Sequence, residues 1–295
     1  MHAMSDPTGL LQGLGLFEYR LVPAGEPLPQ PDLSLPLPQP LPAAFQAQLT
    51  AAERCLQTWP QLFSDPWLEV DQAPLAGPPP RPALFVRLVD TPGSSRPHRT
   101  LKTLNAALWA LMAALGMGSP PQSLPSLPAG LGFSHIGLFP GRATPAPLQL
   151  RCNVVGTPQR QWAWLQQHCT TAVALLQSCG LAGVLLAEPA VAAWSATLDW
   201  ADGWGPRLGV ELYPPGRLQR GSGFGTNEDD AAIAALLQQL DPWLPNGAIT
   251  RCREWHLQQL PPTYQAGFSH LKVVVEPAAP APLQLKLYLL GHAAG

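Results

Sequence analysis

The residues best placed for chemistry lie in two copies of one sequence pattern. Residues 132–156 read GFSHIGLFPGRATPAPLQLRCNVVG, and residues 267–291 read GFSHLKVVVEPAAPAPLQLKLYLLG. Lys286 has the position in the second copy that Arg151 has in the first. The chain contains three lysines, and the second copy holds two of them, Lys272 and Lys286. Because cations that gather in one place bind anions, the second copy is a candidate anion site.

Each copy has the pattern of a β-hairpin. An apolar run leads through a Pro/Gly/Ala connection into a run in which polar and apolar residues alternate. Successive side chains of a strand point to opposite faces, so Arg151 and Asn153 share one face in the first copy, and Lys286 and Tyr288 share one face in the second. Leucines and valines take the other face. A strand with this division is typical of a barrel with a polar interior.

The rest of the chain predicts further hairpins separated by helices. Hairpin arms are expected at 68–71 with 84–89 and at 192–200 with 207–213, and the segment 10–20 has the pattern of a helix or a first strand. Helices are expected over 43–59, 101–117, 158–179, 228–240 and 243–260. The prediction is an α+β fold in a single domain, residues 1–295. About ten antiparallel strands would form a closed barrel inside a ring of α-helices, with room for a ligand.

Residues 23–42 carry a proline at nearly every other position. Proline interrupts a regular helix, so this segment is expected to be an extended surface connection. The alternative is a proline-rich ligand for a partner module.

Composition limits the partners and the compartment. The formal net charge of -2 and the 12% charged fraction argue against a nucleic-acid or anionic-membrane partner. Five cysteines, an odd number at no metal-ligand spacing, indicate reduced thiols in a cytoplasm. The sequence predicts neither a signal peptide nor a membrane span. We therefore expect a soluble, cytoplasmic protein that is a monomer.

The order of hairpins and helices resembles that of the ABBA-type prenyltransferases, and most closely the cyanobactin prenyltransferases, which prenylate ribosomally made cyclic peptides. The likeness covers most of residues 43–291 and is one of pattern. It is carried by the strand end Glu211-Leu212-Tyr213, the C-terminal strand 285–288 and the spacing from Glu69 to the strand at Leu84. Proline interrupts the first hairpin, and Asn153 stands where a tyrosine would strengthen the site. These two departures weaken the likeness.

The resemblance implies that a dimethylallyl or longer isoprenoid moves from its diphosphate to a peptide side chain in the barrel, with Mg²⁺ bridging the phosphates. The diphosphate needs cationic and hydroxyl donors, and the candidates are Arg87, Arg151, Tyr213, Lys272, Lys286 and Tyr288. The allylic cation needs aromatic cover that excludes water. The candidates for the prenyl and acceptor groups are Trp67, Phe133, His135, Trp194, Trp200, Phe268 and His270. Glu69 is the expected base.

Other interpretations remain open. Arg87 has the pattern of a surface charge as well, and the paired histidines also fit shared packing of two equivalent hairpins. A non-catalytic barrel that binds a peptide or a lipid-like ligand fits the few lysines and the lack of an acidic metal-binding cluster. An enzyme that uses the histidines, such as a hydrolase, is a third hypothesis, but the sequence has no nucleophile elbow or metal motif.

Overall fold

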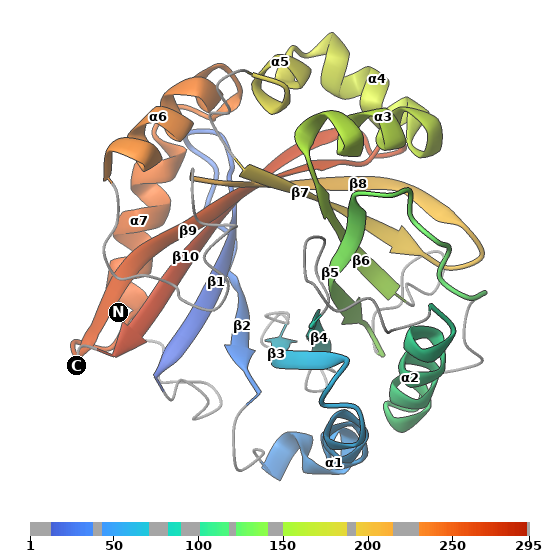
Figure 1. The fold of residues 1–295 in the computed structure, drawn as a ribbon. Coiled ribbons are helices and arrows are strands. Elements are labelled where there is room, and N and C mark those ends of the chain that lie inside the picture. Colours follow the sequence, from blue (N-terminus) through green and yellow to red (C-terminus); the bar gives the residue numbers. More distant parts are fainter. Residues whose placement is uncertain are drawn as a thin grey trace.

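Ten antiparallel strands close into one barrel in the computed structural model of the chain (Figure 1). The order around the barrel is β1-β10-β9-β8-β7-β6-β5-β4-β3-β2, so each strand pairs with its neighbour in the sequence, and β1 pairs with β10 to complete the ring. The structure describes residues 13–37, 43–70, 82–89, 101–117, 122–140, 150–187, 193–214 and 230–293. The expected fold class is confirmed.

The strands and helices alternate along the chain as hairpins and helical connections. The strands are β1 (Leu14–Arg20), β2 (Asp32–Pro36), β3 (Phe63–Val70), β4 (Ala83–Leu88), β5 (Leu131–Leu138), β6 (Leu150–Gly156), β7 (Ala193–Trp200), β8 (Trp204–Tyr213), β9 (Tyr264–Val275) and β10 (Leu283–Ala293). The helices are α1 (Ala43–Thr58), α2 (Leu101–Ala114), α3 (Pro158–His168), α4 (Thr170–Ser178), α5 (Leu181–Leu185), α6 (Asp230–Leu240) and α7 (Ala248–Gln259), and the short 3₁₀ helix η2 (Asp241–Trp243) follows α6.

The helices lie around the outside of the barrel (Figure 1). The apolar core is formed by buried residues of both the strands and these helices. On β9, for example, Leu271, Val273 and Val275 are buried members of this core, whereas Lys272 between them faces the barrel interior. The alternation of apolar and polar residues therefore assigns the leucines and valines to the helices and the charged groups to the interior. None of the described helices has the length and apolar character needed to cross a lipid bilayer.

The proline-rich segment differs from its expected role as a surface connection. Within it, Asp32–Pro36 forms β2, which pairs with both β1 and β3. Leu33 and Leu35 of this strand are buried in the core. The strand fits between prolines because Pro31 precedes it and Pro36 ends it, where a missing N–H interrupts the ladder least. Residues 38–42 of the segment lie outside the described residues.

The helix predicted over 158–179 is two helices. Cys169, with φ of -134°, ends α3 and begins α4, and the β-branched pair Thr170 and Thr171 that follows it favours a fresh helix start over continuation. The predicted stop at Gly180 is confirmed, because this residue adopts a φ of +83° that favours glycine.

The two GFSH copies share a β-bulge. In β5 the register with β6 shifts between Phe133 and His135, and the register of β9 with β10 shifts at the equivalent point. The extra residue is the serine in both copies, Ser134 and Ser269. Each serine Oγ lies close to Nδ1 of the histidine that follows it, at 3.2 Å and 2.9 Å. The repeat therefore preserves a local backbone geometry as well as a sequence.

Candidate functional site

Several of the predicted anion-binding residues meet inside the barrel. Arg151 on β6 and Tyr288 on β10 are 8% and 6% exposed. Their neighbours along the strands, Cys152 and Leu287, lie in the core on the opposite face. The inward orientation that the alternation predicts is therefore what the structure shows for these side chains.

Glu211 on β8 is the centre of one group of interior residues. Its carboxylate accepts hydrogen bonds from four donors on four strands: Asn153 Nδ2 at 3.0 Å, Ser195 Oγ at 3.1 Å, Tyr213 OH at 2.8 Å and Lys272 Nζ at 3.0 Å. Burial alone would raise the pKa of Glu211, but the charges of Lys272 and His270 and the hydrogen bonds bring this pKa down to about 2. Glu211 is therefore a carboxylate at neutral pH.

Glu18 on β1 is the centre of a second group. Lys286 Nζ and Tyr288 OH, both on β10, donate hydrogen bonds to its two carboxylate oxygens. Burial raises the pKa of Glu18, and the lysine charges, led by that of Lys286, lower it to a net value of about 2. The predicted site did not include Glu18. The sequence pattern that indicates an inward-facing Glu18 is its alternation with Phe17 and Tyr19, which are buried on the opposite face. This period of two is typical of a strand and not of a helix.

A stack of three rings joins the two groups. The imidazole of His270 lies between the phenol rings of Tyr213 and Tyr288, with centroid distances of 4.7 Å and 4.0 Å. Burial, followed by the nearby carboxylates, raises the pKa of both phenols well above the usual value, so both hydroxyls stay protonated and act as donors. The structure thus brings together Lys272, Lys286, Tyr213, Tyr288 and His270.

The two arginines of the predicted site form ion pairs that differ in solvent exposure. Arg151 Nε contacts Asp199 Oδ1 at 2.8 Å, and its guanidinium lies 4.8 Å from the centre of the Phe139 ring. Arg87 Nη1 contacts Asp65 Oδ2 at 3.3 Å, with side chains 27% and 52% exposed. Arg151 is therefore an interior group, whereas Arg87 pairs with a solvent-exposed carboxylate.

His135 on β5 lies across the ladder from Arg87 on β4. Burial lowers the pKa of His135, and the charge of Arg87 lowers it further against the opposing effect of Glu211. The imidazole is therefore neutral at neutral pH.

Arg207 on β8 is an interior cation that the predicted site did not include. It shares the inward face with Gly209 and Glu211, and its buried Nη1 finds no hydrogen-bond partner among the described residues. Burial lowers the pKa of Arg207, as does the charge of Arg151, which places these two cations near each other. The alternation of Arg207, Glu211 and Tyr213 along one face was the available signal.

Trp67 and Glu69 lie on β3, where they alternate with the buried core residues Leu68 and Val70. Both side chains therefore belong to the inward face, as the predicted roles require. Burial and the charges of Glu18 and Glu211 raise the pKa of Tyr288, and the charge of Glu69 makes a smaller contribution in the same direction. On the neighbouring strand the same face carries Phe85, which pairs with Trp67.

Four predicted aromatic contacts require correction, because the structure places them in the core outside the barrel wall. Trp194 Nε1 donates to the Leu185 carbonyl of α5 at 3.0 Å, and Trp200 Nε1 donates to the Gln122 carbonyl at 2.9 Å. Phe133 and Phe268 are also members of this outer core. For the phenylalanines the reason is the bulge, because one extra residue puts each of them on the face opposite to the histidine that follows. Trp194 and Trp200 share the face of β7 that carries the core residues Ala196 and Leu198.

The aromatic residues on the inward face are partly different from those predicted. Phe85 and Phe139 meet edge to face with ring centroids 5.4 Å apart. A Cβ atom on Gly137, between them on the same face, would approach the Phe85 ring to 2.5 Å. The interior aromatic surface near Arg151 is therefore formed by these two phenylalanines, which the sequence analysis did not select.

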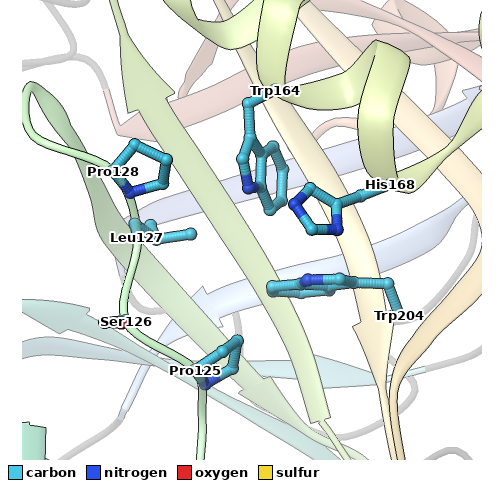
Figure 2. A pocket seen from close by; sticks show the side chains of 7 residues that line it. All are labelled: Pro125, Ser126, Leu127, Pro128, Trp164, His168 and Trp204. Atoms are coloured by element: carbon cyan, nitrogen blue, oxygen red, sulfur yellow. The ribbon is translucent and has the colours of Figure 1, made fainter.

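A pocket of about 300 Å³ lies apart from these interior groups (Figure 2). It is lined by Pro125, Ser126, Leu127, Pro128, Trp164, His168 and Trp204. The indoles of Trp164 on α3 and Trp204 on β8 meet at a right angle, 5.2 Å between centroids. Figure 2 shows the two prolines on the opposite side of the pocket from these rings. None of the predicted site residues lines it.

A comparison of the chain with known protein families and with curated proteins finds no match. Within the described ranges, no three His, Cys, Asp or Glu side chains group as ligands of a metal ion. The carboxylates of Glu18 and Glu211 are each bonded to a lysine instead. These residues do not fit a protein cage for Mg²⁺.

The two interior carboxylates predict an acid-sensitive fold. Because their folded-state pKa of about 2 is below the usual 4.5, each contributes stability above pH 4.5, and this contribution is lost as the pH falls towards 2. Burial of His256 lowers its pKa from 6.5 to about 4, so the loss begins below pH 6.5. We expect the urea midpoint to fall over this range and to fall less in Glu211→Gln. A midpoint independent of pH would contradict the ionised state of both carboxylates.

Proposed function

We propose that the barrel transfers an isoprenoid group from its diphosphate to a side chain of a ribosomally made peptide, inside the barrel. The observation that supports this proposal most is the convergence of two lysines and two phenols on the inward face, around the ring stack of Tyr213, His270 and Tyr288. In the reaction the allylic C–O bond breaks and diphosphate leaves. The allylic carbon bonds to the acceptor atom, whose proton passes to a carboxylate.

The interior side chains divide between the two ends of the donor. Lys272, Lys286 and Arg151, with the hydroxyls of Tyr213 and Tyr288, supply donors for the charge that develops on the leaving diphosphate. The ring faces of Tyr213, Tyr288 and Trp67, with Phe85 and Phe139, supply aromatic surface for the allylic cation and exclude water from it. His270 holds the two phenol rings in their stacked position.

Glu69 is the proposed proton acceptor. Glu18 and Glu211, each with a pKa of about 2 and each bonded to a lysine, are weak bases. Glu69 is on the inward face of β3, and the resemblance gives the glutamate at this spacing the role of the base. The resemblance implies Mg²⁺, which would act as a counter-ion of the diphosphate oxygens.

A non-catalytic barrel that binds a peptide or a lipid-like ligand is the second candidate. The observation that favours it is that both interior lysines already have a carboxylate partner, Glu211 for Lys272 and Glu18 for Lys286. Buried ion pairs of this kind also occur in proteins where they have a structural role and bind no ligand.

A mass-spectrometric assay separates these two functions. The protein is incubated with cyclic and linear peptides, dimethylallyl or geranyl diphosphate, and Mg²⁺. We expect one peptide to gain the mass of one prenyl group, and we expect added inorganic pyrophosphate to inhibit the reaction. Absence of an adduct with every donor, together with tight peptide binding, would support the binding barrel and contradict the transferase.

A further inference from the structure

Glu18 and Arg207 differ from the other charged groups of the interior. Glu18 accepts hydrogen bonds from Lys286 and Tyr288, both of which the proposed function assigns to the diphosphate. Arg207 has a buried Nη1 without a hydrogen-bond partner among the described residues. An anion that enters the barrel therefore competes with Glu18 for the hydrogen bonds of Lys286 and Tyr288. It can also accept a hydrogen bond from Nη1 of Arg207.

Glu18 and Glu211, the carboxylates bonded to Lys286 and Lys272, are not held equally. Glu211 has donors on β6, β7, β8 and β9, whereas the two donors of Glu18 lie on β10. The side chain of Lys286 is 21% exposed and that of Lys272 is 7% exposed. An anion that approaches from solvent therefore meets the Glu18 pair with less reorganisation. Loss of one donor also leaves Glu211 several others.

Charges around Glu18 also favour an added anion. The charges of Lys286 and Lys272 both act on its carboxylate. Arg207 lies on the inward face of β8, two residues from Gly209, where a Cβ atom would meet the Lys272 side chain at 2.7 Å. Burial lowers the pKa of Arg207, as does the charge of Arg151, and the charges of Asp199 and Glu18 raise it. Lys272 and Arg151 already have carboxylate partners, Glu211 and Asp199, so the charge available to an added anion is that of Arg207 and that of Lys286 once it leaves Glu18.

We infer that Glu18 is an internal competitor of the anionic ligand and determines which anions the barrel accepts. The inference rests on the proposed function for the identity of the ligand, a diphosphate. In the exchange, Lys286 and Tyr288 move their hydrogen bonds from Glu18 to the phosphate oxygens, and Arg207 adds a charge-assisted bond. No covalent bond changes. Diphosphate has more charge and more acceptor oxygens than orthophosphate, so competition by Glu18 discriminates against the smaller anion.

Calorimetric titration with inorganic pyrophosphate and with orthophosphate tests this inference. The variant Glu18→Gln keeps the shape of the side chain and removes its charge. We expect it to bind pyrophosphate about tenfold more tightly than the unchanged protein, because one close ion pair no longer competes. We also expect a smaller preference for pyrophosphate over orthophosphate. Arg207→Met is expected to bind pyrophosphate about tenfold more weakly.

Asp65→Asn is the matched control, because it removes the carboxylate of an exposed pair with Arg87. Its pyrophosphate affinity should stay within about twofold of the unchanged protein. Circular dichroism verifies the fold of each variant. Should Glu18→Gln not fold, Glu18→Asp replaces it, since its shorter carboxylate retains the charge but holds Lys286 and Tyr288 less well, and it too should bind more tightly.

The outcomes separate this inference from the proposed function. Pyrophosphate binding that is unchanged or weaker when Glu18 is altered would overturn the competition while leaving the anion site in place. Failure of every variant and of the unchanged protein to bind pyrophosphate would overturn both the competition and the diphosphate site. Tighter binding of pyrophosphate by Glu18→Gln, together with the absence of a prenyl adduct in the peptide assay of the unchanged protein, would support the competition and contradict the transferase.

Discussion

Replacement of Glu211 by alanine is expected to lower the free energy of unfolding by about 3–5 kcal/mol. The Lys272 ammonium would be left buried without its carboxylate partner, which is 3.0 Å away. Asn153, Ser195 and Tyr213 would each lose the same acceptor. A buried charge without a partner costs more than the original pair contributes, so the effect should exceed that of an ordinary core truncation of similar size. Urea denaturation monitored by tryptophan fluorescence measures it.

The control is Asp65→Asn, which also removes the charge of a carboxylate paired with a strand cation and which suits the φ of +43° at this position, a conformation that strains alanine. Because Asp65 is 52% exposed, water replaces it as the partner of Arg87, and the expected loss is about 0–1 kcal/mol. The contrast between the two substitutions isolates the effect of burial. Equal losses in both variants would show that the four hydrogen bonds of Glu211 contribute little to the fold.

The sequence predicted the barrel because its information is local and repeated. Alternation within each arm assigns side chains to two faces, and the turn residues between consecutive arms favour their pairing as hairpins. The two GFSH copies add the same hairpin at two points of the ring. The strand β2 escaped prediction because it has five residues and lies among prolines, where composition favours an extended surface segment.

The candidate site was predictable only in part, because its geometry depends on relations between strands. The inward positions of Arg151, Lys286 and Tyr288 follow from alternation alone. The bulges at Ser134 and Ser269 reverse the face of the phenylalanine before each, and a single extra residue leaves no distinct mark in the alternation. For this reason the predicted aromatic cover was wrong at Phe133 and Phe268.

Contacts between parts of the chain that are distant in the sequence could not be predicted either. Glu18 meets Lys286 only because β1 closes the barrel against β10, which places Glu18 opposite Tyr288. The register of that closure depends on the tilt of all ten strands together. A carboxylate near the start of the chain therefore gave no indication of the cation it neutralises near the end.

Replacement of Lys286 by methionine is expected to reduce kcat/KM for prenyl transfer by about 10²–10³-fold. Methionine keeps the length and the apolar stem of the side chain but removes the ammonium that, in the proposed function, stabilises the leaving diphosphate. Arg207 and Lys272 remain, so some activity should persist. Initial rates of adduct formation at several donor concentrations measure the effect, and circular dichroism verifies the fold.

The chain provides a matched control in Lys102→Met, since Lys102 is the remaining lysine and is exposed on α2, outside the barrel. Its kcat/KM should stay within about twofold, because a solvated surface charge contributes little to a buried site. Loss of activity in Lys286→Met alone would tie catalysis to the cation inside the barrel. Full activity in Lys286→Met would remove the diphosphate from this part of the interior. A comparable loss in both variants would show instead that the total positive charge of the molecule, and not the position of Lys286, determines the rate.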